Sequence, residues 1–496
     1  MTPTAPRSPV GDKPPDPNLI YINGIDPETG TYAVRPRLID NWAKIVKQRP
    51  GADALVDVHP GVQQGEKPRS FAAIFDRDLT DLKDVGWAVV VPEDGAREVR
   101  DALAPLIEHR RKQAGDLLKI LDYKKDEQVR DWYDRHKISA GTFKRKAVPY
   151  YLLLAGPPTA IPFEFQYLLG VEYAVGRVAF DTTAEYGRYA TSVVAYETAA
   201  AVANRREIVY WGTRHMGDPA TKLSASMLIG PLAKGLPQSE DDDLKEPIHA
   251  NLGYTCKVYI GDDAKRKALL GTLCSDKPPA FLFTASHGMA IPSGRPNQIT
   301  DNGALLCQDW PGFGGVRREH YLAAADVPDD ANVSGLVAFF FACFGAGTPH
   351  SDQFLMDLSD AGKAPPLAPQ PFVAALPRRL LTHPKGGALA VVGHVDRAWG
   401  FSIEPPKMTE PQIGPFRNSL GFILRGAPVG FAISLDFGQR YATLSTQLLN
   451  ALSPTAQETE RLSDRALVTF WLERNDAQNY VILGDPAVRI REDAMA

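Results

Sequence analysis

The sequence predicts an α/β fold with a mainly parallel sheet in two adjoining portions. Short apolar runs end abruptly at glycine, as strands buried on both faces of a parallel sheet do. The longer stretches between these runs carry apolar residues at helix-like intervals. Strands and helices that alternate in this way form βαβ units, in which the strands are parallel.

The N-terminal part of the chain shows the weakest pattern. Residues 1–17 contain six prolines and are predicted to form a disordered arm. Residues 18–85 are interpreted as an N-terminal extension. Strands are expected there at 18–23 and 70–75, where apolar residues cluster.

Two α/β portions follow, a supporting one at 86–203 and a larger one at 204–496. In the first, the elements expected in order are strand 87–92, helical stretch 96–121, short helix 128–136, strands 150–155 and 173–178, and helix 184–201. In the second, strands are expected to begin at residues 206, 254, 280, 336, 387 and 480, and helices at 263–273, 372–382, 418–424 and 431–452. Gly484–Pro486 is predicted to be a structural turn.

Length and composition limit the class of protein. A chain of 496 residues is too long to fold around one simple hydrophobic core. Its net charge of −4 provides no basic field that would bind nucleic acid or an anionic membrane. No apolar run approaches the ~20 residues of a membrane helix, and residues 1–18 lack the apolar core of a secretory signal. The four cysteines show neither a disulfide framework nor zinc-site spacing. We therefore expect a cytoplasmic protein without a metal or another cofactor.

Two of the predicted buried strands end in side chains that can do chemistry. The run that begins at Ala280 leads to His287 and Gly288, and the run that begins at Leu336 leads to Cys343. The carboxyl edge of a parallel sheet is where α/β proteins bind ligands. A structural role in the core explains Cys343 alone better than catalysis does, and it explains His287 alone equally well. The two together favour a cysteine–histidine dyad.

The chemistry of such a dyad explains why a cysteine, a histidine and a neighbouring glycine would lie together. A thiol attacks only as the thiolate, and a free cysteine has a pKa of ~8.5. A neighbouring histidine favours the ion pair and later protonates the leaving amine. The main-chain N–H groups of Gly288 and Cys343 are the expected oxyanion donors. Asp301 and Asn302 follow His287 closely in the sequence and are candidates to orient its imidazole.

Five segments resemble motifs of caspase-like (clan CD) cysteine peptidases, above all those of the gingipain-like branch. Thr284–Gly288 and Phe341–Gly345 resemble the His-Gly and Ala-Cys motifs of this clan, which also includes the CHAT domains. The other three segments are similar to parts of the gingipain-like branch outside the dyad, and they are Tyr151–Pro162, Tyr173–Tyr196 and Tyr480–Ile490. The sequence departs from the branch at Pro157, where aspartate is frequent.

The resemblance implies a caspase-hemoglobinase-like, three-layer α/β/α fold. It also implies an intracellular endopeptidase that cleaves protein or peptide substrates, although gingipains themselves are secreted. In that enzyme Cys343 is the nucleophile, His287 the general acid/base, and Gly288 part of the oxyanion hole. Residues 204–496 form the catalytic portion.

The resemblance further implies a substrate-binding pocket at the loop that follows the strand ending near residue 394. Its expected residues are His394, Asp396 and Trp399. If Asp396 lies at the floor of this pocket, charge pairing favours a basic residue on the acyl side of the scissile bond. In the alternative, Asp396 pairs with Arg397 on the surface.

Two other functions stay open at this point. The chain could be a scaffold or regulatory binding protein with a silent caspase-like fold and residues 1–85 as its contact module. A Rossmann-like nucleotide enzyme ranks last, because no G-x-G-x-x-G follows the first strands. For the peptidase, we expect activation by a protein partner or by processing, and the polar loops 235–250 and 360–371 are places where the chain could be cut.

Overall fold

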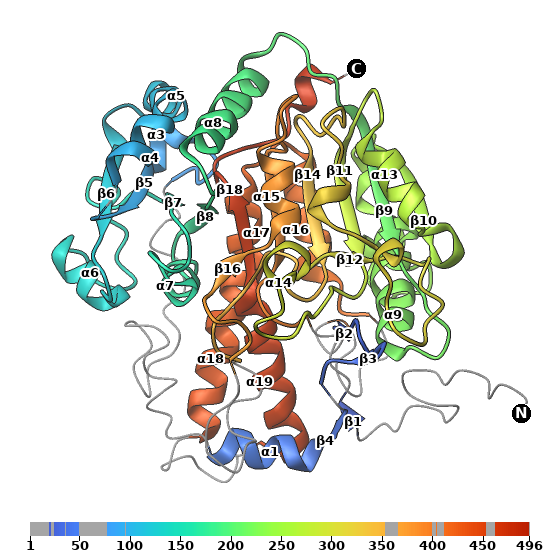
Figure 1. Cartoon of the computed structure of the whole chain (residues 1–496). Helices are drawn as coiled ribbons and strands as arrows, with labels where there is room; N and C mark the ends of the chain where they lie inside the picture. Colours follow the sequence, from blue (N-terminus) through green and yellow to red (C-terminus); the bar gives the residue numbers. More distant parts are fainter. Residues whose placement is uncertain are drawn as a thin grey trace, which may run out of the picture.

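The computed structural model describes residues 19–20, 24–34, 36–48, 77–94, 96–352, 366–398, 403, 411–452 and 462–495. Its centre is a ten-stranded sheet with the order β10-β9-β11-β14-β17-β18-β8-β7-β5-β6 (Figure 1). The strands are β5 (Trp87–Pro92), β6 (Leu118–Tyr123), β7 (Tyr151–Ala155), β8 (Ala174–Val178), β9 (Arg205–Gly212), β10 (Thr255–Ile260), β11 (Pro279–Ala285), β14 (Val337–Phe341), β17 (Ala390–His394) and β18 (Tyr480–Gly484).

Neighbouring strands of this sheet run parallel, except for the antiparallel pair β17–β18. This confirms the predicted α/β class with a mainly parallel sheet. The two predicted portions meet where β18 pairs with β8. A Cβ added at Gly176 on β8 would lie 2.3 Å from the carbonyl oxygen of Gly484, so this close approach requires glycine.

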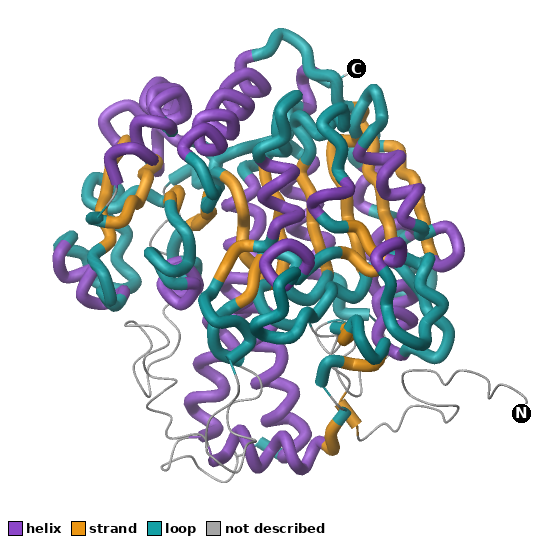
Figure 2. Tube along the Cα trace, viewed as in Figure 1, coloured by secondary structure: helices purple, strands orange, loops and turns teal. Residues whose placement is uncertain are grey.

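In the first portion, helices cover both faces of the part of the sheet that β5, β6, β7 and β8 form (Figure 2). Alternate residues of β5 enter different cores, because successive side chains of a strand point to opposite faces. Trp87 and Val89 pack with the core that includes α5 (Ala104–Ala114) and α8 (Thr183–Thr198). Ala88 and Val90 pack with the other core, which includes α6 (Val129–Arg135) and α7 (Phe163–Leu169).

The prediction of a helical stretch at 96–121 is wrong beyond residue 114. The chain forms α4 (Ala96–Ala102) and α5, and α5 ends at Gly115, which has a φ of 57°. Residues 118–123 then form β6, the edge strand of the sheet, with partly alternating burial. An edge strand of mixed polarity is hard to separate from the end of a helix by apolar spacing alone.

In the second portion, the helices of the C-terminal part pack on the sheet. Phe416 of α16 lies with its ring 6.2 Å from that of Phe283 and 5.7 Å from that of Phe339. The predicted helix 431–452 is divided by a π-helical turn at Ser434–Gly438. The first residues of the predicted helix 372–382 form the short strand β16 (Phe372–Val373) instead. The helices are α13 (Arg266–Leu273), α15 (Ala375–Leu381), α16 (Gly414–Leu424), α17 (Val429–Ile433), α18 (Gln439–Leu452) and α19 (Asp464–Asn479), of which α19 was not predicted.

The N-terminal extension packs against the second portion. Helix α1 (Ile39–Gln48) crosses the ends of α18 and α19, where Trp42 lies 5.7 Å from Trp471 between ring centroids (Figure 1). The predicted strand 18–23 appears as β1 (Leu19–Ile20), which pairs with β4 (Arg37–Leu38); its remaining residues, the arm 1–17 and the strand 70–75 lie outside the described residues. A second pair, β2 (Ile25–Asp26) and β3 (Thr31–Tyr32), forms a hairpin.

The remaining elements are short. They are α3 (Leu82–Val85), α9 (Pro219–Ser224), α10 (Gly230–Lys234), α11 (Asp242–Lys245), α12 (Ile248–Asn251), α14 (Gln298–Asp301), β12 (Leu305–Leu306), β13 (Tyr321–Leu322) and β15 (Gly347–Thr348). No helix within the described ranges is both long enough and apolar enough to cross a membrane.

Asp485 joins the two portions through a buried ionic contact. Its carboxylate accepts hydrogen bonds from Trp87 Nε1 (2.9 Å) and from Arg110 Nε (2.7 Å). Arg110 also pairs with Glu197 at 2.6 Å. Burial opposes ionisation of Glu197, but the Arg110 charge and the hydrogen bonds from His109 and Arg110 together outweigh it and lower the pKa of Glu197 to about 2. The turn Gly484–Pro486 therefore has a structural role, as predicted.

Replacing Asp485 with alanine should leave the buried guanidinium of Arg110 with only one of its two carboxylates. We expect a loss of about 3–5 kcal/mol in the free energy of unfolding, measured by denaturant titration. Asp493→Ala is the control, because that side chain is 71% exposed and should change stability by no more than about 0.5 kcal/mol. Equal effects of the two substitutions would contradict this account of the junction.

Candidate active site

His287 and Cys343 lie at the same edge of the sheet. Strands β11 and β14 are adjacent and parallel, and Ala285 pairs with Phe341 at their carboxyl ends. His287 and Cys343 each follow two residues later, so they leave the sheet at the same level. Neighbouring strands lie about 4.8 Å apart, which brings the two side chains into one locality.

The imidazole of His287 is held at both nitrogens. The side chain is only 1% exposed, and Nε2 lies 2.7 Å from Asp218 Oδ2. Nδ1 accepts a hydrogen bond from the main-chain N–H of Gly24 at 3.2 Å. Because Nδ1 accepts, the proton of the neutral ring is on Nε2, facing Asp218.

Asp218 was not predicted from the sequence. It is the N-cap of α9, where its carboxylate accepts from the N–H of Ala220, and it also accepts from the hydroxyls of Thr221 (2.6 Å) and Tyr32. Burial alone would raise the pKa of Asp218, but the charge of His287 and these hydrogen bonds hold it well below its usual value. The Asp-Pro pair before a helix signals only an N-cap, so nothing in the sequence links it to His287.

Asp301 and Asn302, which were expected to orient the imidazole, make their hydrogen bonds to other residues, so this prediction is wrong. Asn302 accepts from the N–H of Ile291 at 2.7 Å and donates to Thr348. Asp301 accepts from the hydroxyl of Tyr321 at 2.8 Å. Proximity in sequence to His287 was the only argument for them.

The thiol of Cys343 is fully buried. Its Sγ accepts a hydrogen bond from the N–H of Ala398 at 3.3 Å. Burial raises the pKa of Cys343 to about 12, against the smaller opposing effects of the Ala398 hydrogen bond and the Arg397 charge. The thiol is therefore neutral at physiological pH in this state.

The main chain of Gly24 adjoins both His287 and Cys343. While its N–H contacts His287, a Cβ built on Gly24 would lie 3.7 Å from Cys343 Sγ. Gly24 has a φ of 107°, a conformation that side-chain-bearing residues rarely adopt. A segment of the N-terminal extension thus reaches the edge of the sheet where the two predicted residues lie.

Gly288 lies directly against Cys343. A Cβ at Gly288 would fall 1.8 Å from the carbonyl oxygen of Cys343, so no other residue fits there. Both residues are buried, yet within the described part of the chain their main-chain N–H groups donate no hydrogen bond. Unpartnered buried N–H groups are rare, and two of them close together can donate hydrogen bonds to a developing negative charge.

The residues expected to line a substrate pocket are mostly internal. His394 is fully buried, with Nε2 3.2 Å from Asp476 Oδ1. Asp396 is also fully buried at a φ of 74°, and it lies 3.4 Å from Arg397, so the two pair in the interior and not on the surface. Arg397 pairs more closely with Asp352, at 2.8 Å. Trp399 lies outside the described residues.

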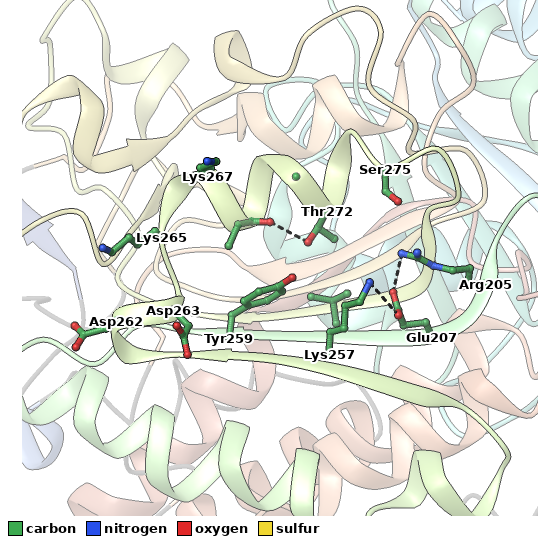
Figure 3. A pocket seen from close by; sticks show the side chains of 13 residues that line it. Arg205, Glu207, Lys257, Tyr259, Asp262, Asp263, Lys265, Lys267, Thr272 and Ser275 are labelled. Atoms are coloured by element: carbon green, nitrogen blue, oxygen red, sulfur yellow. Dashed lines mark hydrogen bonds and ion pairs between the residues drawn. The ribbon is translucent and has the colours of Figure 1, made fainter.

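A pocket of about 550 Å³ lies elsewhere, between β9, β10 and α13 (Figure 3). Figure 3 shows Arg205 and Lys257 pointing toward Glu207, to which they pair at 2.8 and 3.2 Å. None of the predicted site residues lines this pocket. Within the described residues, no three His, Cys, Asp or Glu side chains are grouped to hold a metal ion.

The edge that carries His287 and Cys343 agrees with the resemblance found in the sequence. A mainly parallel α/β sheet whose adjacent strands deliver histidine and cysteine to one edge is the arrangement expected of a caspase-like cysteine peptidase. No family model and no curated protein matches the sequence.

Solved structures similar to this chain include gingipain R, an Arg-specific cysteine proteinase, at 12% identity and a TM-score of 0.44, covering 82% of this chain and 78% of that one. A structure described as a protease is similar at 12% identity and a TM-score of 0.47, covering 84% and 81%. The separase–securin complex of Saccharomyces cerevisiae follows at 12% identity and a TM-score of 0.30, covering 68% of this chain and 15% of that one. Likenesses this distant say nothing about the chemistry of this chain, which rests on its own side chains.

The burial of Cys343 predicts the order in which the thiols react with a small general reagent. Cys274 is exposed, whereas Cys343 is fully buried and has a pKa of about 12. In the folded chain, iodoacetamide at pH 8 should alkylate Cys274 at least ~10-fold faster than Cys343, as measured by peptide mapping over time. Faster alkylation of Cys343 would show that the thiol is open and ionised, against this description.

Proposed function

We propose that the protein is a cysteine endopeptidase with Cys343 as nucleophile and His287 as general acid/base. The observation that carries this proposal is the main chain of Gly24, whose N–H contacts His287 Nδ1 while its Cα side adjoins Cys343 Sγ. A peptide backbone thus occupies the space between an acid/base and a thiol, as a substrate must.

The geometry supports a complete reaction. Asp218 holds the Nε2 proton, so Nδ1 is the nitrogen that takes the proton of the thiol. Sγ then attacks the carbonyl carbon of the substrate, and the N–H groups of Gly288 and Cys343 donate hydrogen bonds to the oxyanion. His287 returns the proton to the leaving nitrogen, the C–N bond breaks, and water hydrolyses the thioester. Asp218 acts through His287 and is a positioning residue.

The proposed enzyme requires activation. With Nδ1 occupied by Gly24 and the thiol buried, the described state is a latent one. Release by a protein partner or by processing accounts for this state. The cysteines that the structure describes are free, which suits the reducing cytoplasm that we propose as the location.

Specificity is proposed to lie in the loop after β17. His394, Asp396 and Trp399 are the candidate pocket residues. The carbonyl oxygen of Asp396 accepts from the N–H of Phe344, next to the nucleophile, so this loop adjoins the reacting centre. A basic substrate residue would have to compete with Arg397 for the carboxylate of Asp396.

The alternative is a catalytically silent scaffold or regulatory binding protein. The observation that favours it is again that Gly24 occupies His287 Nδ1 and that the thiol of Cys343 is buried. If this arrangement never opens, the protein cannot catalyse a reaction at Cys343. The two proposals differ in whether Cys343 ever forms an acyl-enzyme.

A positional-scanning peptide library separates the two functions. We expect the wild-type chain to cleave a defined subset of peptides and Cys343→Ala to cleave none, with both proteins equally folded. Cys274→Ala is the matched control, since its exposed thiol lies outside the site, and it should keep full activity. An active Cys343→Ala protein, or a wild type that stays inert even with candidate partners, would favour the scaffold.

The role of Asp218 predicts a separate kinetic effect. Asp218→Asn keeps the shape of the side chain but lets the imidazole turn or change tautomer. We expect kcat to fall by roughly 10²-fold or more while KM changes little, because substrate contacts are intact. Steady-state kinetics on the best library peptide measure this, with Asp301→Asn as a control that should retain kcat.

A further inference from the structure

The β2–β3 hairpin of the N-terminal extension is bound to two segments that lie between β11 and β14. Ile25 forms a parallel bridge with Met289, and its carbonyl oxygen accepts from the N–H of Ala290 at 3.2 Å. At the turn, the carbonyl oxygen of Pro27 accepts from the N–H of Val316 at 2.7 Å. Main-chain hydrogen bonds therefore fix the hairpin both at its first strand and at its turn.

Burial holds the same hairpin in place beside α9 (Figure 1). Ile25 is fully buried and Tyr32 is 5% exposed. They belong to one apolar cluster with Met289 and Trp310. Removing the hairpin would expose this cluster to water, which is unfavourable because apolar surface loses free energy of burial. The hairpin is thus part of the folded core of the second portion.

Tyr32 reaches the carboxylate that holds the imidazole. Its hydroxyl donates to Oδ1 of Asp218, whereas the hydroxyl of Thr221 donates to Oδ2, the oxygen that also faces His287 Nε2. The main-chain N–H of Ala220 adds a hydrogen bond to Oδ1 at 3.2 Å. Because both oxygens are held, the carboxylate cannot turn without breaking buried hydrogen bonds.

The ring of Tyr32 also contacts the imidazole itself. The ring centroids of Tyr32 and His287 lie 5.8 Å apart at an interplanar angle of 78°, which is an edge-on contact. Both side chains are buried, so neither ring can move far without displacing the other. One side chain of the hairpin therefore restrains the imidazole by packing and its carboxylate partner by hydrogen bonding.

We infer that Tyr32 is a positioning residue of the active site, and that the active enzyme retains the β2–β3 hairpin as a permanent part of that site. The inference rests on the proposed peptidase function and assigns part of it to the N-terminal extension. Activation then requires only that the main chain at Gly24 leave His287 Nδ1, while Tyr32 stays on Asp218.

Steady-state kinetics of Tyr32→Phe on the best library peptide test the positioning role. The substitution keeps the ring and removes the hydroxyl, so kcat should fall roughly 10-fold while KM stays nearly unchanged. Tyr321→Phe is the matched control, because Tyr321 lies in the same apolar cluster and its hydroxyl also donates to an aspartate, Asp301. That aspartate is not the partner of His287, so the control should retain kcat.

A double-mutant cycle separates positioning from a general structural effect. If Tyr32 acts through Asp218, Tyr32→Phe should lower kcat by less than about 2-fold in a chain that already carries Asp218→Asn. A full 10-fold loss in both backgrounds would show that Tyr32 acts independently of Asp218. An unchanged kcat in Tyr32→Phe alone would show that the hydroxyl is not needed. Either result overturns the inference and leaves the proposed peptidase function standing.

Peptide mapping of the reacted enzyme tests whether the hairpin is retained. Protein whose Cys343 carries a peptidyl acyloxymethyl ketone, isolated by size-exclusion chromatography, should still contain residues 24–34. Labelled protein that lacks these residues would overturn the inference, although the protein would still be a cysteine peptidase. A wild type that neither reacts at Cys343 nor cleaves any library peptide would instead remove the proposed function, and the inference with it.

Discussion

The parallel pairing of β11 with β14 is the constraint on which the rest of the structure depends. It fixes Ala285 opposite Phe341, and so delivers His287 and Cys343 to the same edge of the sheet. The fit of Gly288 against the carbonyl of Cys343 continues this register beyond the strands. A shift of one residue would turn every following side chain to the other face and separate the two reactive groups.

Support for the site comes from segments far away in the sequence. Asp218 reaches His287 from the start of α9, and Gly24 reaches it from the N-terminal extension. The buried polar contacts among these residues are satisfied together, so displacing the hairpin affects both the imidazole and the carboxylate that orients it. The contact of Gly24 with Nδ1 and the positioning of the imidazole by Asp218 thus belong to one connected set of contacts.

The sheet and the placement of His287 and Cys343 at one edge could be predicted from the sequence, because a buried strand followed by such a side chain and a nearby glycine is a local signal. Asp218 and Gly24 could not, because their contacts span 69 and 263 residues and leave no local pattern. The edge strand β6 was not predicted because its polar residues interrupt the alternation of apolar and polar side chains that indicates a strand. Helix α19 was not predicted because many of its buried residues are polar, among them Glu473 and Asp476. Its buried face therefore lacks the apolar spacing that indicates a helix.

The measurement that tests the central claim most directly is the site of attack by a peptidyl acyloxymethyl ketone. Such a reagent is drawn to a peptide-binding cleft and needs an activated thiol. In the activated protein we expect an adduct on Cys343 that is lost in His287→Ala, whereas iodoacetamide selects the exposed Cys274 in the state described. An adduct on Cys274 alone, or one on Cys343 that forms equally well without His287, would contradict it.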